Sequence, residues 1–157
     1  MALALVDSMS NELRQKAIRL LARREHTRVE LARKLAAYGT PEEIAAVIAE
    51  LQVSHLQSDS RFAETYVRSH AARLGALRLR QTLKTKGVTG DLIEAQLAPG
   101  VLPDELERAR TIWSRKFSAA PADAREWARQ ARFLQGRGFA GDIIRGLLRE
   151  PVGALDE

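Results

Sequence analysis

The three histidines, His26, His55 and His70, are the residues best suited to acid–base or metal chemistry, but they are scattered singly along the chain. A transition-metal site needs several His, Cys or carboxylate ligands at close spacing, and the chain contains no cysteine. No G-x-S-x-G, P-loop or H-E-x-x-H pattern occurs. We therefore predict no catalytic residue, no metal site and no cofactor, and interpret the histidines as structural.

Two Gly-x-x-Gly-Asp segments, at 87–91 and 138–142, have a composition that suits phosphate binding at a helix N-terminus. Neither contains the Lys-Ser or Lys-Thr pair of a P-loop, and neither follows a predicted strand. The pattern Gly-apolar-x-Gly-Asp-apolar-Ile-x-x-x-Leu recurs in them with an offset of 51 residues. We interpret both segments as helix stops followed by helix starts.

The strongest local charge feature is a basic run without acidic neighbours. The chain has 25 basic and 20 acidic residues, for a formal net charge of +5, and no Asp or Glu lies between Glu64 and Asp91. Such a run is either a solvated helix face or a contact surface for an acidic partner, and we favour contact. The predicted partner-binding residues, called the basic segment below, are Arg68, Arg73, Arg78, Arg80, Lys84 and Lys86.

Apolar spacing indicates the helices that must position this charge. A weaker version of the glycine pattern follows Gly39, so the chain contains three repeats of about fifty residues. Before each repeat glycine, apolar pairs share one helical face: Leu31 with Leu35, Leu79 with Leu83, and Phe133 with Leu134. Each glycine is expected to end that helix in a left-handed conformation.

Each repeat is predicted to contain three helices, because a further apolar helical face precedes each hairpin, for example Leu13 with Ala17. Capping-box spacing predicts helix starts at Thr27, Thr40, Asp104 and Asp123, and Pro41 suits a first helical position. The aromatic residues of the third repeat are assigned to its core. They are Trp113, Phe117, Trp127, Phe133 and Phe139.

The predicted fold class is all-α, with three tandem three-helix repeats in an elongated, curved array. The expected divisions are an N-terminal tail at 1–10, repeats at 11–57, 58–100 and 101–150, and a C-terminal tail at 151–157. Both tails are expected to fray. Nowhere do eighteen apolar residues run together, so we expect no membrane span. The absence of cysteine favours the cytoplasm.

Separated motifs in this order resemble the RecX family over nearly the whole chain. They are Leu20-Leu-Ala-Arg-Arg-Glu-His-Thr-Arg-Val-Glu-Leu-Ala-Arg-Lys-Leu35, Asp59-Ser-Arg-Phe-Ala-Glu-Thr-Tyr-Val-Arg68, Leu79-Arg-Gln-Thr-Leu-Lys-Thr-Lys-Gly87, and Arg132-Phe-Leu-Gln-Gly-Arg-Gly-Phe139 ahead of Ile143-Ile144. One departure is Asp59-Ser60, where the family usually has a more acidic pair.

The resemblance implies a non-enzymatic regulator that binds the RecA filament on single-stranded DNA and inhibits its ATP hydrolysis and strand exchange. Such a protein would limit recombination, DNA repair and the SOS response. We expect a monomer with RecA as its partner and DNA as a further one. Two alternatives stay open: a nucleic-acid-binding protein that acts without RecA, and a helical scaffold for another acidic protein.

Overall fold

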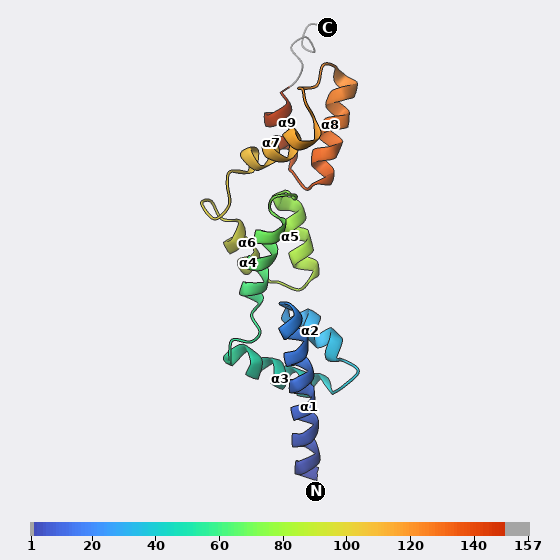
Figure 1. Cartoon of the computed structure of the whole chain (residues 1–157), viewed down its shortest axis with the longest axis vertical. Coiled ribbons are helices and arrows are strands. Elements are labelled where there is room, and N and C mark those ends of the chain that lie inside the picture. Colours follow the sequence, from blue (N-terminus) through green and yellow to red (C-terminus); the bar gives the residue numbers. More distant parts are fainter. Residues whose placement is uncertain (1, 150–157) are drawn as a thin grey trace. The chain divides into compact units, whose positions relative to one another are not determined.

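The computed structural model describes residues 2–149 of the chain, and side chains from residue 8 onward. Within these residues the structure contains helices and no named strand, which confirms the all-α prediction (Figure 1). The helices are α1 (Ala2–Arg23), α2 (Arg28–Leu35), α3 (Pro41–Val53), α4 (Asp59–His70), α5 (Ala76–Thr85), α6 (Gly90–Leu97), α7 (Glu105–Lys116), α8 (Ala124–Gly136) and α9 (Gly141–Leu148). They form three successive groups of three, as the repeats predicted. No helix among these residues is long and apolar enough to cross a membrane.

The chain divides into two compact units whose boundaries do not follow the repeats. The first unit comprises Met1–Thr65 with Lys84–Leu92, and the second comprises Tyr66–Leu83 with Ile93–Glu157. The middle repeat therefore contributes residues to both units.

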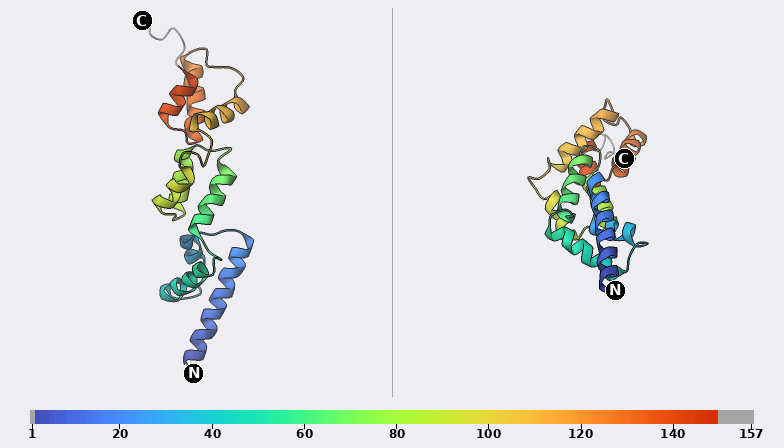
Figure 2. Two further views of the ribbon diagram at one scale, coloured as in Figure 1. Left: turned by 90° about the vertical axis from the view of Figure 1, so that its left-hand side faces the viewer. Right: turned by 60° about the horizontal axis from the view of Figure 1, so that its bottom comes forward.

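The core of the first unit is built by α1, α2 and α3. The predicted pairs are buried, because Leu31 and Leu35 are fully enclosed and pack with Leu13 and Ala17 of α1. The N-terminal part of α1 projects beyond α2 and α3 (Figure 2). Because α1 begins at Ala2, the prediction that 1–10 form a frayed tail is wrong for the described residues 2–10, where Ala and Leu favour a helix. The predicted tail at 151–157 lies outside the described residues.

The predicted helix starts are confirmed at all four positions. Thr27 forms a full capping box with Glu30, while Thr40 and Asp123 accept hydrogen bonds from the amides three residues later. Pro41 occupies the first turn of α3. Asp104 is the N-cap residue of α7, where the spacing predicted a helix start, but its side chain makes no capping hydrogen bond.

The repeat glycines differ from one another in backbone conformation. Gly87 and Gly138 have φ of 91° and 97°, which confirms the predicted left-handed helix stops. Gly39 is not among the glycines with positive φ, so this prediction is wrong for the first repeat. A Cβ at Gly39 would lie 3.2 Å from Leu13 Cδ2, so this glycine packs closely on α1.

The core of the second unit lies mainly among α7, α8 and α9. Ala109, Leu134 and Leu148 are buried there, together with Phe139. Of the aromatic residues assigned to the core, Phe117 and Phe139 are buried. Trp113, Trp127 and Phe133 pack against the core but keep part of their surface exposed, so their assignment to the interior was only partly correct.

Within each unit, side chains and glycines tie consecutive repeats together. In the first unit the Thr27 hydroxyl donates to the Lys86 carbonyl at 2.6 Å, and the Arg28 amide donates to Asp59 Oδ1 at 2.8 Å. Asp59, the residue at the departure from the family pattern, therefore caps the first turn of α2. In the second unit the Gly75 amide donates to the Arg137 carbonyl at 2.7 Å.

Candidate partner-binding surfaces

The six residues of the basic segment do not belong to a single unit. Arg68, Arg73, Arg78 and Arg80 lie in the second unit, whereas Lys84 and Lys86 lie in the first. The segment is continuous in sequence because α5 runs from one unit into the other. Each part is therefore a separate candidate surface.

Arg80 is held by an ion pair. Its Nε and Nη2 donate to the two carboxylate oxygens of Glu94 on α6, at 2.6 and 3.2 Å. These hydrogen bonds lower the pKa of Glu94 and raise that of Arg80. The pair is exposed enough for water to screen it, so it adds little stability. The pair nevertheless neutralises Arg80, which the sequence predicted to be available for partner binding.

Arg78 keeps most of its donors available. Its Nη1 donates to the Gly136 carbonyl at 2.6 Å, near the end of α8, and the side chain is exposed. A guanidinium has five N–H groups, so this contact leaves others for a partner. Arg68 is exposed on α4. Arg73 is exposed in the turn after α4 and has no ion-pair partner among the described residues.

The lysines of the first unit differ in accessibility. Lys84 is exposed near the end of α5 and forms no ion pair with any described residue. Lys86 is half-buried, with Nζ 6.0 Å from the centroid of the Phe62 ring. The pKa of the Glu30 carboxyl is lowered, because burial raises it but hydrogen bonds from Arg24 and Thr27 outweigh the burial. The positive charge of Lys86 lies close enough to Glu30 to add to this lowering. Lys86 therefore has a structural role within the unit.

A second cationic surface appears on the third repeat, in the α7–α8 cation–aromatic cluster. Phe117 and Phe133 meet edge to face with centroids 5.4 Å apart. Lys116 Nζ and the Arg137 guanidinium lie 5.5 and 5.2 Å from the Phe133 centroid, and the Arg129 guanidinium lies 5.2 Å from that of Phe117. Phe117 is buried, whereas Phe133 is partly exposed. A partly exposed aromatic ring among cations is a pattern of proteins that bind single-stranded nucleic acid.

No group of three or more His, Asp or Glu side chains that could hold a metal ion occurs among the described residues. His26 is buried, with Nδ1 3.0 Å from the Arg24 carbonyl and Nε2 3.2 Å from Lys34 Nζ. Burial lowers the pKa of His26. A neutral ring with a proton on Nδ1 satisfies both contacts, which agrees with the structural role predicted for this residue.

Sequence comparison decides the family. The chain matches the RecX first three-helix domain at 14–51, the second at 58–97 and the third at 103–148. The chain belongs to the RecX family. It is similar to the Regulatory protein RecX of Leptothrix cholodnii, with 47% identity over 138 residues that cover 87% of each chain. The Chromobacterium violaceum protein of the same name is 44% identical over 92% of each chain.

Solved RecX structures share the fold. The crystal structure of RecX from Lactobacillus salivarius matches with a TM-score of 0.77 at 21% identity, over 91% of this chain and 96% of the other. A second crystal structure of a regulatory protein RecX matches with a TM-score of 0.73, over 95% of this chain and 76% of the other. At this identity the match concerns the fold alone.

The sequence did not indicate the cation–aromatic cluster of this RecX chain, because acidic and basic residues alternate along the third repeat. In the structure, Arg108 pairs with Glu105 and Arg129 pairs with Glu126. Arg125, Arg132 and Arg137 are exposed and have no ion-pair partner among residues 8–149. The alternation of charges in sequence thus hid a net positive surface around α8.

Proposed function

We propose that this protein binds the RecA filament on single-stranded DNA and inhibits its ATPase and strand-exchange activities. It would thereby limit homologous recombination and SOS induction in the cytoplasm, without catalysing a reaction itself. The observation that carries the proposal is the match to all three RecX domains, in order, across 14–148. The relatives of this chain are named regulatory proteins, and this supports a role in binding.

The exposed members of the basic segment are proposed to contact RecA or DNA. Arg73 and Lys84 are the strongest candidates, because both are exposed and neither pairs with an acid in the described part of the chain. Arg78 retains donors besides the one that contacts Gly136. Each exposed contact is worth on the order of 1 kcal/mol or less, so several must act together.

The test is ATP hydrolysis by the cognate RecA on single-stranded DNA, with this protein titrated in. A variant with Arg73, Arg78, Arg80 and Lys84 changed to Ala is compared with a control that loses the same charge at Arg19, Arg23, Arg33 and Arg110. All four control residues are exposed. We expect the wild-type protein and the control to inhibit alike, and the basic-segment variant to inhibit much less while keeping its helical circular dichroism.

The outcomes separate the function from the residues. If the wild-type protein leaves hydrolysis unchanged, RecA regulation is excluded for this chain. If both variants inhibit as the wild type does, the function stands and the basic segment is not the contact surface.

Direct binding of nucleic acid is a second candidate, favoured by the α7–α8 cation–aromatic cluster. A strand could stack bases near Phe133 while Lys116 and Arg137 contact phosphates. The test is binding of labelled oligo-dT in the absence of RecA at several salt concentrations. Affinity that falls steeply with salt, and that drops in Lys116→Ala with Arg137→Ala but not in Arg23→Ala with Arg110→Ala, would support this candidate.

A further inference from the structure

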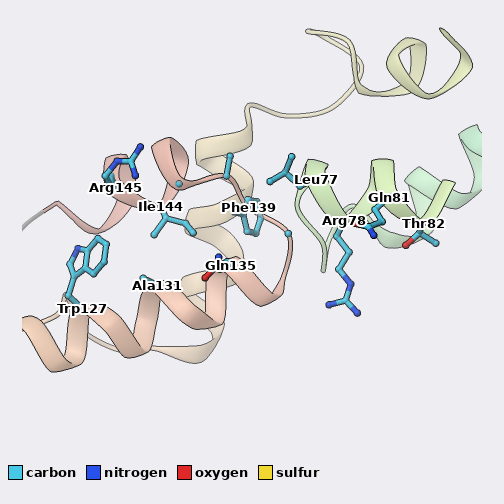
Figure 3. Close-up of a pocket in the computed structure, with 13 residues that line it drawn as sticks. Leu77, Arg78, Gln81, Thr82, Trp127, Ala131, Gln135, Phe139, Ile144 and Arg145 are labelled. Atoms are coloured by element: carbon cyan, nitrogen blue, oxygen red, sulfur yellow. The ribbon is translucent and has the colours of Figure 1, made fainter. Parts of the chain in front are cut away.

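The second unit contains a groove that the basic segment does not explain. Its volume is about 660 Å³, and it is lined from α5, α8, the turn after α8, and α9. Leu77 is half exposed and provides open apolar surface, whereas Phe139 and Ile144 line the groove but are buried, and Trp127 contributes its indole. Figure 3 shows Arg145 and Arg78 toward opposite ends of this lining, with Phe139 and Ile144 between them.

The walls of the groove are fixed by backbone contacts. The Leu77 amide donates to the Gly138 carbonyl at 3.0 Å, beside the hydrogen bond from Gly75 to Arg137. A Cβ on Gly138 would lie 2.3 Å from Arg78 Cβ, so α5 and the turn after α8 are in direct contact. A preformed groove loses little conformational entropy when a ligand binds.

The electrostatics of the groove favour an anionic ligand. Its lining includes two arginines and no Asp or Glu. Arg145 is exposed and lies over the start of α9, where a Cβ on Gly141 would be 3.0 Å from its Nη1. The Trp127 indole N–H is buried and has no hydrogen-bond partner within the described structure.

We propose that this groove binds a short acidic segment of a partner protein, with an aliphatic side chain against Leu77 and carboxylates toward Arg78 and Arg145. The proposal deepens the proposed function and rests on it for the partner, because the segment would belong to the filament protein. The exposed Leu77 favours an aliphatic side chain as the apolar part of the ligand, and oligo-dT in the test below distinguishes a peptide from a nucleic acid. The exposed Gln135 amide suits the main chain of a peptide.

The experiment follows the two indole N–H signals of the ¹⁵N-labelled full chain by NMR. The probe is the blocked peptide Glu-Asp-Leu-Leu-Asp-Glu, and its controls are Gln-Asn-Leu-Leu-Asn-Gln and oligo-dT. The Trp113 indole already donates to Gln130 Oε1 at 2.7 Å, so it is an internal reference. Spectra of Trp113→Phe assign the two signals.

The expected result is a saturable shift of the Trp127 signal with the acidic peptide and little change at Trp113. Arg145→Glu should weaken binding about tenfold or more, because an attractive contact becomes repulsive, whereas Arg110→Glu, an exposed change on α7, should not. Arg78→Ala is the second variant, and it should also weaken binding. Circular dichroism verifies the fold of each protein.

Three results would overturn the proposal. They are an absent shift, an equal response to the neutral peptide, and a Trp127 shift produced by oligo-dT that competes with the peptide. The last result would identify the groove as a phosphate site. Because no RecA is present, the peptide result is independent of ATPase inhibition, and failure of one claim can be distinguished from failure of the other.

Discussion

Gly75 and Gly138 lie backbone against backbone, so that a Cβ built on Gly75 would be only 2.4 Å from the Gly138 carbonyl oxygen. Gly75 precedes α5 of the second repeat and Gly138 follows α8 of the third. A side chain at either position would separate the two segments and break the hydrogen bonds of Gly75 and Leu77. The absence of side chains therefore creates the contact between these repeats within the second unit.

Gly75→Ala is expected to lower the free energy of unfolding by about 1–3 kcal/mol, because the clash is with backbone atoms that cannot rotate away. Urea denaturation followed by circular dichroism measures the change. The matched control is Gly136→Ala, where an added Cβ meets nothing within 4 Å. It should be neutral or slightly stabilising, since Ala is a better helix former. Equal behaviour of the two variants would contradict the close approach.

Gly87 makes the corresponding contact in the first unit. A Cβ there would be 2.4 Å from Val29 Cγ2, and the backbone φ is 91°. Gly100 has a similar φ of 89° but open space around it, so Gly100→Ala measures the conformational cost alone, about 1–2 kcal/mol. Gly87→Ala should cost more than Gly100→Ala.

A double-mutant cycle isolates the clash at Gly87. Adding Val29→Ala to Gly87→Ala should recover part of the excess over Gly100→Ala, because it removes the two methyl groups that the new Cβ would meet, whereas the Val29 Cβ at 2.6 Å remains. If the two substitutions are simply additive in the free energy of unfolding, the steric explanation is wrong.

These contacts show what the sequence could predict and what it could not. The glycine pattern and the periodicity of Leu31 and Leu35 predicted the helices, since both depend on neighbours within one or two turns. The packing of Gly75 on Gly138 joins positions 63 residues apart, and no local pattern encodes it. The pairing of Arg80 with Glu94 was missed for the same reason, because the acid follows in the next helix.

Arg108 is a buried cation that joins α7 to the turn after α4. It is only 7% exposed, it pairs with Glu105, and it donates to the carbonyls of Ala71 and Leu74. Arg108→Met should destabilise the protein by about 3–5 kcal/mol, since it leaves the half-buried Glu105 carboxylate without its counter-charge and two carbonyls without their donor. Thermal unfolding measures the effect. Arg110→Met, an exposed change two residues away, should stay within about 0.5 kcal/mol of the wild type, and an equal loss in both variants would exclude this role for Arg108.

His26 is expected to make stability depend on pH between about 7 and 5. Burial lowers its pKa from the ordinary value of 6.5, and the nearby charges of Arg24 and Lys34 act in the same direction. As the pH falls through about 6.5, the unfolded chain takes up a proton at His26 that the folded chain does not, so the free energy of unfolding decreases. Stability from this group is therefore complete above the unfolded pKa and is lost in acid.

Urea titrations at pH 7, 6 and 5 measure the slope, and His26→Gln should flatten it. The carboxyl of Glu30, whose pKa the fold lowers from the ordinary value of 4.5, acts in the same direction but mainly at pH 5 and below, so the interval from pH 7 to 6 reports His26. An unchanged slope in His26→Gln would show that the folded protein accepts a proton at His26 as readily as the unfolded chain does.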